Sequence, residues 1–187
     1  HEGGAACQGT LNNTGSVWSV PLGGGCPKQM IGNQAAPHGM ASDGTNLFYA
    51  NQGTFNANNG SIQRIPIGGG SATPIATGQA FPLDIAVDGA NVYWTNSADG
   101  SVWKSDKTTP NPIKLAGPGG LNHARFLRVD ATNVYFTDGV GGVVNRVPIA
   151  GGSVVAMTTP VTLPGHLAID STNAYYASRG QTTAAMM

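Results

Sequence analysis

Charged side chains are scarce in this sequence. Asp, Glu, Lys and Arg make up 10% of the 187 residues, with nine acidic and nine basic side chains, so the formal net charge is zero. Soluble domains typically carry about 25% charged residues. A nucleic-acid partner would require a basic surface that neutralises phosphates, and an anionic lipid surface would require one as well. We therefore expect no nucleic-acid partner and no electrostatic docking to membranes.

Long hydrophobic runs are also absent. No stretch approaches the roughly 18 apolar residues that span a bilayer, so we expect no membrane span. The charged n-region and apolar h-region of a secretion signal are missing, and we expect that any such signal has been removed. The polar surface that remains is rich in Asn, Thr, Ser, Gln and Gly, which suits hydrogen bonding to polar ligands or self-association.

Cysteine occurs twice, as Cys7 and Cys26. A disulfide between them would close a loop of about 20 residues and contribute roughly 3 kcal/mol. It would also indicate an oxidising compartment, that is, an extracellular, periplasmic or cell-surface location. The alternative is two unrelated thiols, because a simple antiparallel layout puts the two residues at opposite ends of one strand. We favour the disulfide, since an exposed free thiol is a liability outside the cell.

The sequence does contain a fourfold internal repeat. Each unit has a short apolar segment that ends in aspartate, and the aspartates are spaced by 45, 42 and 40 residues. Periods near 40 in a strand-rich chain are typical of radial β architectures, in which each unit buries its apolar faces against its neighbours. The four segments are 37–43, 82–88, 124–130 and 164–170.

Turn chemistry divides each unit into four short extended segments. After the closing aspartate comes an Asp-x-x-Asn turn, then an aromatic-rich strand, then a strand opening with Gly, then a Pro and glycine cluster. No stretch of ten residues keeps a helical period, so we predict an all-β fold of four-stranded antiparallel blades. We assign residues 1–14 to an N-terminal segment, 15–180 to the repeats and 181–187 to a tail. The units end near residues 51, 96, 138 and 178.

The segment Val92-Tyr93-Trp94-Thr95-Asn96, preceded by Pro82 to Asp88, resembles the YWTD repeat of low-density-lipoprotein-receptor β-propellers. It is also similar to NHL-like and bacterial secreted propeller repeats. The resemblance implies that the Pro-to-Asp strand is innermost and that the aromatic strand is second in each blade. The final Asp of the motif is kept in one unit of four. The residues at that position are Asn51, Asn96, Asp138 and Ser178.

The blade count stays open between two alternatives. In one, the N-terminal hairpin completes the blade begun by residues 164–178, which closes a four-bladed ring and removes exposed sheet edges. In the other, the chain is part of a six-bladed propeller, as the resemblance implies, or of a ring completed by another chain. We favour closure within one chain.

Ligands of propellers commonly bind at one end of the central channel, where loops lead into the innermost strands. Five side chains at these positions form our candidate ligand site. A histidine and carboxylate set of this kind is a reasonable ligand group for zinc, copper or nickel, although no metal-ligand spacing pre-organises it. The alternative is that the side chains line a wet channel without binding metal, and we predict no cofactor. The five residues are His38, Asp84, His123, Arg125 and His166.

Catalytic motifs are sparse, and the repeated aspartates sit in turns, which predicts a scaffold role for Asp43, Asp88, Asp130 and Asp170. Trp18, Trp94 and Trp103 could stack on sugars, but their places in the strand pattern favour packing between blades. We therefore favour a secreted or cell-surface, non-catalytic module that binds a polar ligand, either a glycan or a protein. Two alternatives remain. One is a subunit of an extracellular filament or lattice assembled through strand edges. The other is a lyase or hydrolase using His38, Asp84 and His166.

Overall fold

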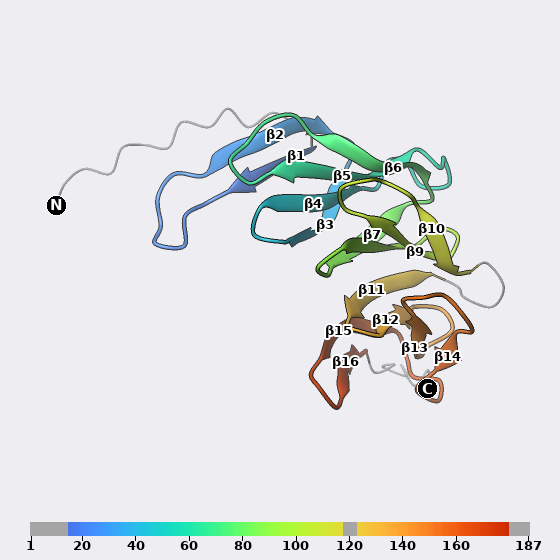
Figure 1. The fold of residues 1–187 in the computed structure, drawn as a ribbon. Coiled ribbons are helices and arrows are strands. Elements are labelled where there is room, and N and C mark those ends of the chain that lie inside the picture. The colour runs from blue at the N-terminus through green and yellow to red at the C-terminus, as the bar shows by residue number, and fades with distance from the viewer. Residues whose placement is uncertain (1–14, 118–122, 180–187) are drawn as a thin grey trace, which may run out of the picture.

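The computed structural model describes residues 15–117 and 123–179 (Figure 1). These residues form strands joined by turns and contain no helix, so none that could cross a membrane. The all-β prediction is confirmed. The strands are β1 (Gly15–Ser19), β2 (Lys28–Gln34), β3 (Pro37–Ser42), β4 (Asn46–Asn51), β5 (Gly60–Pro66), β6 (Thr73–Gln79), β7 (Pro82–Val87), β8 (Asn91–Asn96), β9 (Val102–Asp106), β10 (Ile113–Ala116), β11 (Ala124–Val129), β12 (Asn133–Asp138), β13 (Val143–Pro148), β14 (Val155–Ala156), β15 (Pro164–Ile169) and β16 (Ala174–Ser178).

The strands pair in chain order into antiparallel sheets. Three sheets have four strands each, namely β3 to β6, β7 to β10 and β11 to β14. The first strands of successive sheets, β3, β7, β11 and β15, contact one another in sequence and so form the inner edge of the array. This is the arrangement of propeller blades, with the Pro-to-Asp strand innermost and the aromatic strand second.

The ends of the array do not form one blade. β1–β2 and β15–β16 are separate two-stranded sheets, and no pairing between described residues joins β1 to β16. Figure 1 shows the two hairpins at opposite ends of the stack. The prediction of a ring closed within one chain is therefore wrong for the described strands. Residues as large as Tyr93 and Phe136 fill the space between neighbouring sheets, and the described sheets form an open series from β1–β2 to β15–β16, which we call the arc.

Each unit is organised by its Asp-x-x-Asn turn. In all four turns, Oδ1 of the aspartate accepts the backbone N–H groups of the residues two and three positions later, at 2.6–3.0 Å. The aspartate N–H in turn donates to the carbonyl of the asparagine, which closes the hairpin between first and second strands. The predicted scaffold role of these aspartates is confirmed, since a short polar side chain that binds its own backbone favours this turn.

The second carboxylate oxygen of each aspartate also has a partner. In three units a tyrosine five residues later donates its hydroxyl to Oδ2, as Tyr93 does to Asp88 at 2.6 Å. The first unit has Phe48 at that position. Its Asp43 instead accepts Lys107 Nζ, from the neighbouring blade, at 3.0 Å, and the same ammonium donates to Asp88 O at 2.9 Å. In the first unit, a contact between blades thus replaces the Tyr–Asp contact that is made within the blade in the other three units.

Replacing Lys107 by methionine is therefore expected to lower the free energy of unfolding by about 1–2 kcal/mol, because Asp43 and Asp88 lose a donor that is 11% exposed. Adding Phe48→Tyr to Lys107→Met should recover part of the loss, since it supplies the hydroxyl that the other three units use. Urea unfolding of the parent and the two variants measures this. Failure of Phe48→Tyr to recover stability would contradict the view that Lys107 takes the role that the tyrosine hydroxyl has in the other three units.

Acid is expected to destabilise the fold below about pH 4. The backbone N–H of Asn46 and, against the effect of burial, the Lys107 ammonium lower the pKa of Asp43 to about 2. The backbone N–H of Thr172 and the Tyr175 hydroxyl lower the pKa of Asp170. A carboxyl whose folded pKa is lowered contributes stability above its unfolded pKa of about 3.9, and that stability is lost as pH falls toward the folded value.

The measurement is urea unfolding at intervals between pH 5 and pH 2. The combined change of Asp88, Asp130 and Asp170 to asparagine should flatten the pH dependence, because the amide keeps the turn acceptor but no longer titrates. An unchanged slope in this variant would show that other groups govern acid unfolding.

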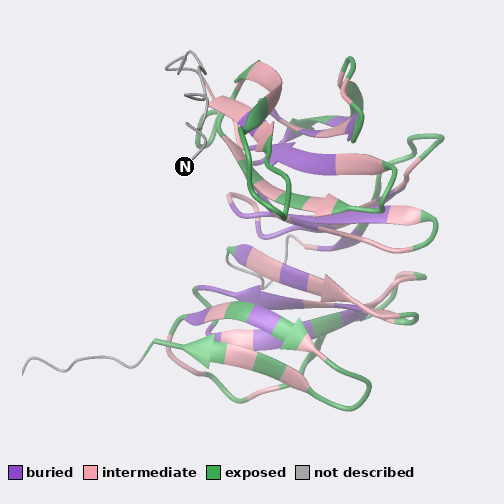
Figure 2. Ribbon diagram, turned by 90° about the vertical axis from the view of Figure 1, so that its left-hand side faces the viewer, coloured by how far each residue is buried: buried purple, intermediate pink, exposed green. Residues whose placement is uncertain are grey.

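The core lies between blades, where buried residues of the middle strands meet the next sheet (Figure 2). Alternate residues of β8 point to opposite faces. Tyr93 packs toward Leu127 and Phe136 of the following blade, and Trp94 packs toward Phe48 of the preceding one. The prediction that the tryptophans pack between blades is thus confirmed for Trp94.

Candidate functional site

Four loops lead into the inner strands, and in each the last residue before the strand lies in the left-handed backbone region. These four inlet residues, as we name them, directly precede β3, β7, β11 and β15, and none of them is glycine. A side chain in this region costs roughly 1–2 kcal/mol, and glycine avoids that cost. The inlet residues are Ala36 (φ 56°), Phe81 (φ 58°), His123 (φ 66°) and Leu163 (φ 45°).

A repeated hydrogen bond joins each inlet residue to the end of the second strand of its own blade. The residue that follows the second strand donates its N–H to the inlet carbonyl, as Ser97 does to Phe81 at 3.0 Å and Gly139 to His123 at 3.1 Å. Arg179 makes the same contact with Leu163 at 3.5 Å. The inlet loops and the segments after β4, β8, β12 and β16 therefore lie on one face of the arc.

Two of the predicted ligand residues connect neighbouring inner strands. Nδ1 of His38 on β3 donates to Leu83 O on β7 at 2.9 Å. Asp84 on β7 accepts the N–H of Leu127 on β11 at 3.0 Å and an Arg128 Nη at 3.4 Å. Because these contacts engage their polar atoms between blades, His38 and Asp84 support the packing of the arc.

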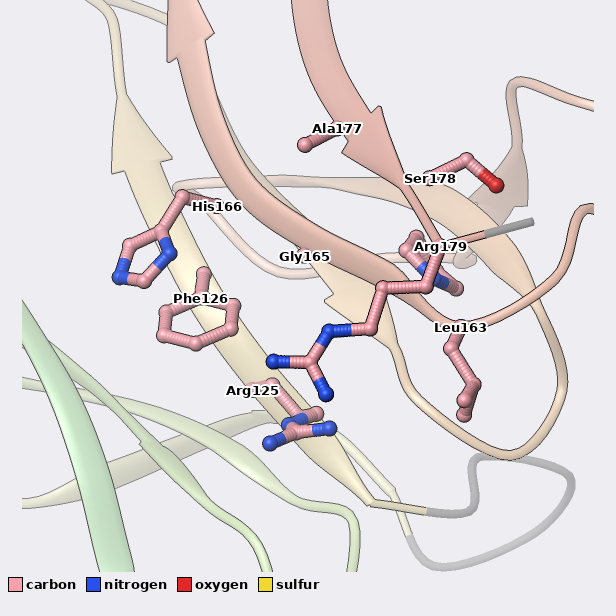
Figure 3. A pocket seen from close by; sticks show the side chains of 9 residues that line it. Arg125, Phe126, Leu163, Gly165, His166, Ala177, Ser178 and Arg179 are labelled. Atoms are coloured by element: carbon pink, nitrogen blue, oxygen red, sulfur yellow. The ribbon is translucent and has the colours of Figure 1, made fainter. Parts of the chain in front are cut away.

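The other three predicted residues, His123, Arg125 and His166, lie near one another, with Arg125 between the two histidines in the hollows that they line. A hollow of about 300 Å³ is lined by Arg125 and Phe126 of β11, by His166 of β15, and by Arg179 after β16. The Phe126 and His166 rings stack with centroids 3.8 Å apart, and the Arg125 guanidinium carbon lies 5.5 Å from the Phe126 centroid. Figure 3 shows the two guanidinium groups directed toward the same space beside the Phe126 ring.

Two further hollows continue this one. His123 and Arg125 line a hollow of about 250 Å³ together with Leu163, and a third of about 390 Å³ runs along residues 139–142 and 160–163. Leu163 lines all three hollows, so they form one shallow groove, which we call the inlet groove. The structure thus brings His123, Arg125 and His166 to one groove, and neither His38 nor Asp84 lines it.

The inlet groove is positively charged. The ion pairs within residues 15–117 and 123–179 are Lys107–Asp43 and Arg128–Asp84, so neither Arg125 nor Arg179 is paired with a carboxylate there. Over the same residues, no three His, Cys, Asp or Glu side chains come close enough to hold a metal ion. The groove therefore offers unpaired cations and aromatic rings, and lacks the ligand set of a metal centre.

Sequence reasoning missed Arg179, Leu163 and Val140 as groove residues. Aligning the repeats one position beyond the motif would have placed Arg179 beside the inlet loops, because residues 52, 97 and 139 occupy the equivalent position. Cys7 lies outside the described residues, and its disulfide with Cys26 stays a prediction.

Comparison with known proteins supports the fold. No family model and no curated protein matches this sequence. Among solved structures, a chain of the nidogen/laminin complex is similar, with a TM-score of 0.72, 21% identity, and coverage of 88% of this chain and 67% of that one. The computationally designed Ika4 protein is similar with a TM-score of 0.67 and 14% identity, over 80% of this chain and 89% of Ika4.

A streptogramin B lyase is also similar in structure, with a TM-score of 0.64 and 14% identity. This chain is aligned over 78% of its length and spans about half, 49%, of the lyase. Identities this low indicate a shared fold, and propellers host both binding and catalytic proteins. The chain therefore has the β-propeller fold, and its function must be argued from its own residues.

Proposed function

We propose that this chain is a non-catalytic binding module, secreted or at the cell surface, that holds a polar ligand on the face formed by its inlet loops. The observation that carries the proposal is the set of strained inlet residues. The sequence contains 28 glycines, and Gly53, Gly100 and Gly142 already occupy positive φ in other loops. Retaining Phe81, His123 and Leu163 at strained positions is understandable if their side chains contact a ligand, since backbone strain concentrates at functional sites.

The arrangement of the titratable side chains supports binding over catalysis. His38 and Asp84 are engaged with neighbouring strands, and His166 stacks on Phe126. An acid–base pair would need both groups within reach of one substrate atom. A protein ligand also has a precedent in this fold, because a similar chain was solved in a complex of nidogen with laminin.

The test exploits the strain. Changing Phe81, His123 and Leu163 together to glycine should leave the fold intact or raise its melting temperature, because each substitution relieves a left-handed backbone. The same variant should lose binding to those components of glycan and extracellular-protein arrays that the parent chain binds. Ala35→Gly, next to an inlet residue but without positive φ, is the control and should keep that binding.

Two outcomes would contradict the proposal. The first is a triple variant that unfolds at lower temperature, which would mean that the inlet side chains serve the fold. The second is an array experiment without binding that depends on the inlet residues: either the parent chain binds no array component, or the triple variant binds every component that the parent binds.

A second candidate function, a subunit of an extracellular assembly, is favoured by the outer edge of β16, which pairs with no other strand of residues 15–117 and 123–179. Tyr175 is 54% exposed there, whereas its counterpart Tyr93 on β8 is fully buried. Trp94 pairs with Trp103 in the second blade, and the repeat alignment puts Tyr176 opposite Trp18 of β1 from another copy. Sedimentation over a range of concentrations tests this. Association that Ala177→Lys on β16 abolishes would support it, and a monomer at all concentrations would exclude it.

A further inference from the structure

We infer that the inlet groove recognises an acidic side chain adjacent to an aliphatic one on a protein partner. This inference rests on the proposed binding function and names the chemistry of the ligand. Its starting point is the charge of the groove. Two guanidinium groups, on Arg125 and Arg179, face one space without a carboxylate among the described residues, in a chain whose formal net charge is zero.

An anion between these groups would relieve their mutual repulsion. Like charges in a partly desolvated hollow repel more strongly than in bulk water, and a carboxylate between them turns repulsion into attraction. Guanidinium groups bind carboxylates through paired N–H donors, with charge-assisted bonds stronger than neutral ones. The hollow around Arg125, about 300 Å³, is at the small end of ligand sites and suits one side chain.

Among the described residues, the Arg125 guanidinium has no hydrogen-bond acceptor and is held in place by packing. Its stem crosses Gly139 so closely that a Cβ added there would lie 2.6 Å from Arg125 Cδ. Its guanidinium lies over the Phe126 ring, and the His166 ring stacks on Phe126 with centroids 3.8 Å apart. Because apolar contacts orient the guanidinium, its N–H donors remain available, and a ligand would not need to order the side chain first.

The groove also has an apolar part next to the arginines. Val140 is 64% exposed and Leu163 is 46% exposed, and both line the hollow that contains Arg125. Exposed aliphatic residues beside arginine are typical of protein interfaces, where arginine is enriched and apolar side chains form the centre. An acidic glycan could supply the carboxylate, but it has no aliphatic side chain to cover Val140 and Leu163. We therefore assign the groove to a peptide segment.

The test is a nuclear magnetic resonance titration of the chain with three capped hexapeptides. The first is Ser-Gly-Glu-Leu-Gly-Ser, the second has Gln for Glu, and the third has Ser for Leu. The first peptide should shift the amide signals of Arg125, Val140 and Leu163. The Gln and Ser peptides should each bind about tenfold more weakly, because one loses the charged hydrogen bonds and the other the apolar contact.

Protein variants provide the matched controls. Arg125→Gln and Arg179→Gln should each weaken the Glu peptide about tenfold and leave the affinity for the Gln peptide unchanged. Arg146→Gln removes an exposed arginine on β13, outside the groove, and should have no effect on either peptide. Tighter binding of trigalacturonate than of the Glu peptide would overturn the assignment in favour of an acidic glycan.

Equal affinity for the Glu and Gln peptides, an equal effect of Arg146→Gln, or no shift of groove signals with any peptide would also overturn the inference. The proposed function fails separately. If array binding is still lost in the triple glycine variant while the peptides show no preference for Glu, the inlet face binds a ligand of other chemistry. If the triple variant keeps all array binding, both proposals fail.

Discussion

Replacing Trp94 by alanine is expected to lower the free energy of unfolding by about 3–5 kcal/mol. The side chain is fully buried between two blades, packed against Phe48 and Ile62 of the preceding sheet. Its ring also stacks on Trp103 with centroids 6.2 Å apart. The strands on either side are hydrogen-bonded along their length, so they cannot collapse into the space that the indole leaves, and the loss includes the cost of a cavity.

The indole N–H adds a polar contribution to this loss. Nε1 of Trp94 donates to Gln79 Oε1 at 2.8 Å, and Asn96 Nδ2 donates to the same oxygen at 3.0 Å, all within the buried interior. Trp94→Phe keeps a large ring but removes the donor, and it should cost less than Trp94→Ala. Trp18→Ala is the control, because Trp18 is a tryptophan of the two-stranded sheet β1–β2, in the position that corresponds to Trp103, and is only partly buried. Urea unfolding in which Trp18→Ala costs as much as Trp94→Ala would contradict this account.

Local chemistry explains how much of the fold the sequence predicts. The Asp-x-x-Asn turn is satisfied within four residues, so the hairpin between first and second strands can be predicted in each unit from its own sequence. The alternation of Tyr93 and Trp94 likewise follows from the period of a strand. These features recur because each depends on neighbours in the chain.

Contacts between blades were harder to predict. Gln79 accepts from both Trp94 and Asn96, and Gln34 accepts from Tyr49 and Asn51 in the same way, 45 residues earlier. These glutamines lie at the ends of fourth strands, outside the recognised motif, so only a full alignment of the repeats would have identified them. Their recurrence indicates that the fourth strand of one blade organises the second strand of the next.

The candidate site shows the same limit. The inner-strand positions suggested all five residues, and the structure places His123, Arg125 and His166 along one groove, whereas His38 and Asp84 connect strands. Whether a polar side chain faces the channel or the next strand depends on the rotation of each sheet relative to the next. That rotation depends on the volume of the side chains packed between the sheets, which the repeat pattern does not specify.

Gly39→Ala is expected to lower the free energy of unfolding by about 2–3 kcal/mol, since a clash in a packed interior is relieved only by moving whole strands. A Cβ on Gly39 of β3 would lie 2.4 Å from Leu83 O and 2.6 Å from Asp84 Cα of β7. Both are backbone atoms of a paired strand, so neither can swing aside as a flexible side chain would. Separating β3 from β7 would also break the hydrogen bond from His38 to Leu83 O.

Gly89→Ala provides the matched control for this contact between blades. Gly89 lies in the Asp88 turn, has no positive φ, and an added Cβ would meet no atom within 4 Å. Alanine there should leave the stability unchanged or raise it by about 0.4–1 kcal/mol, because it restricts the unfolded chain. Thermal and urea unfolding of the two variants compare the same Gly→Ala substitution at a close contact between inner strands and at an open turn. If both substitutions have the same effect, the close approach of β3 to β7 does not hold the first two blades together. The orientation of these two blades must then be set by the side chains around Trp94 alone.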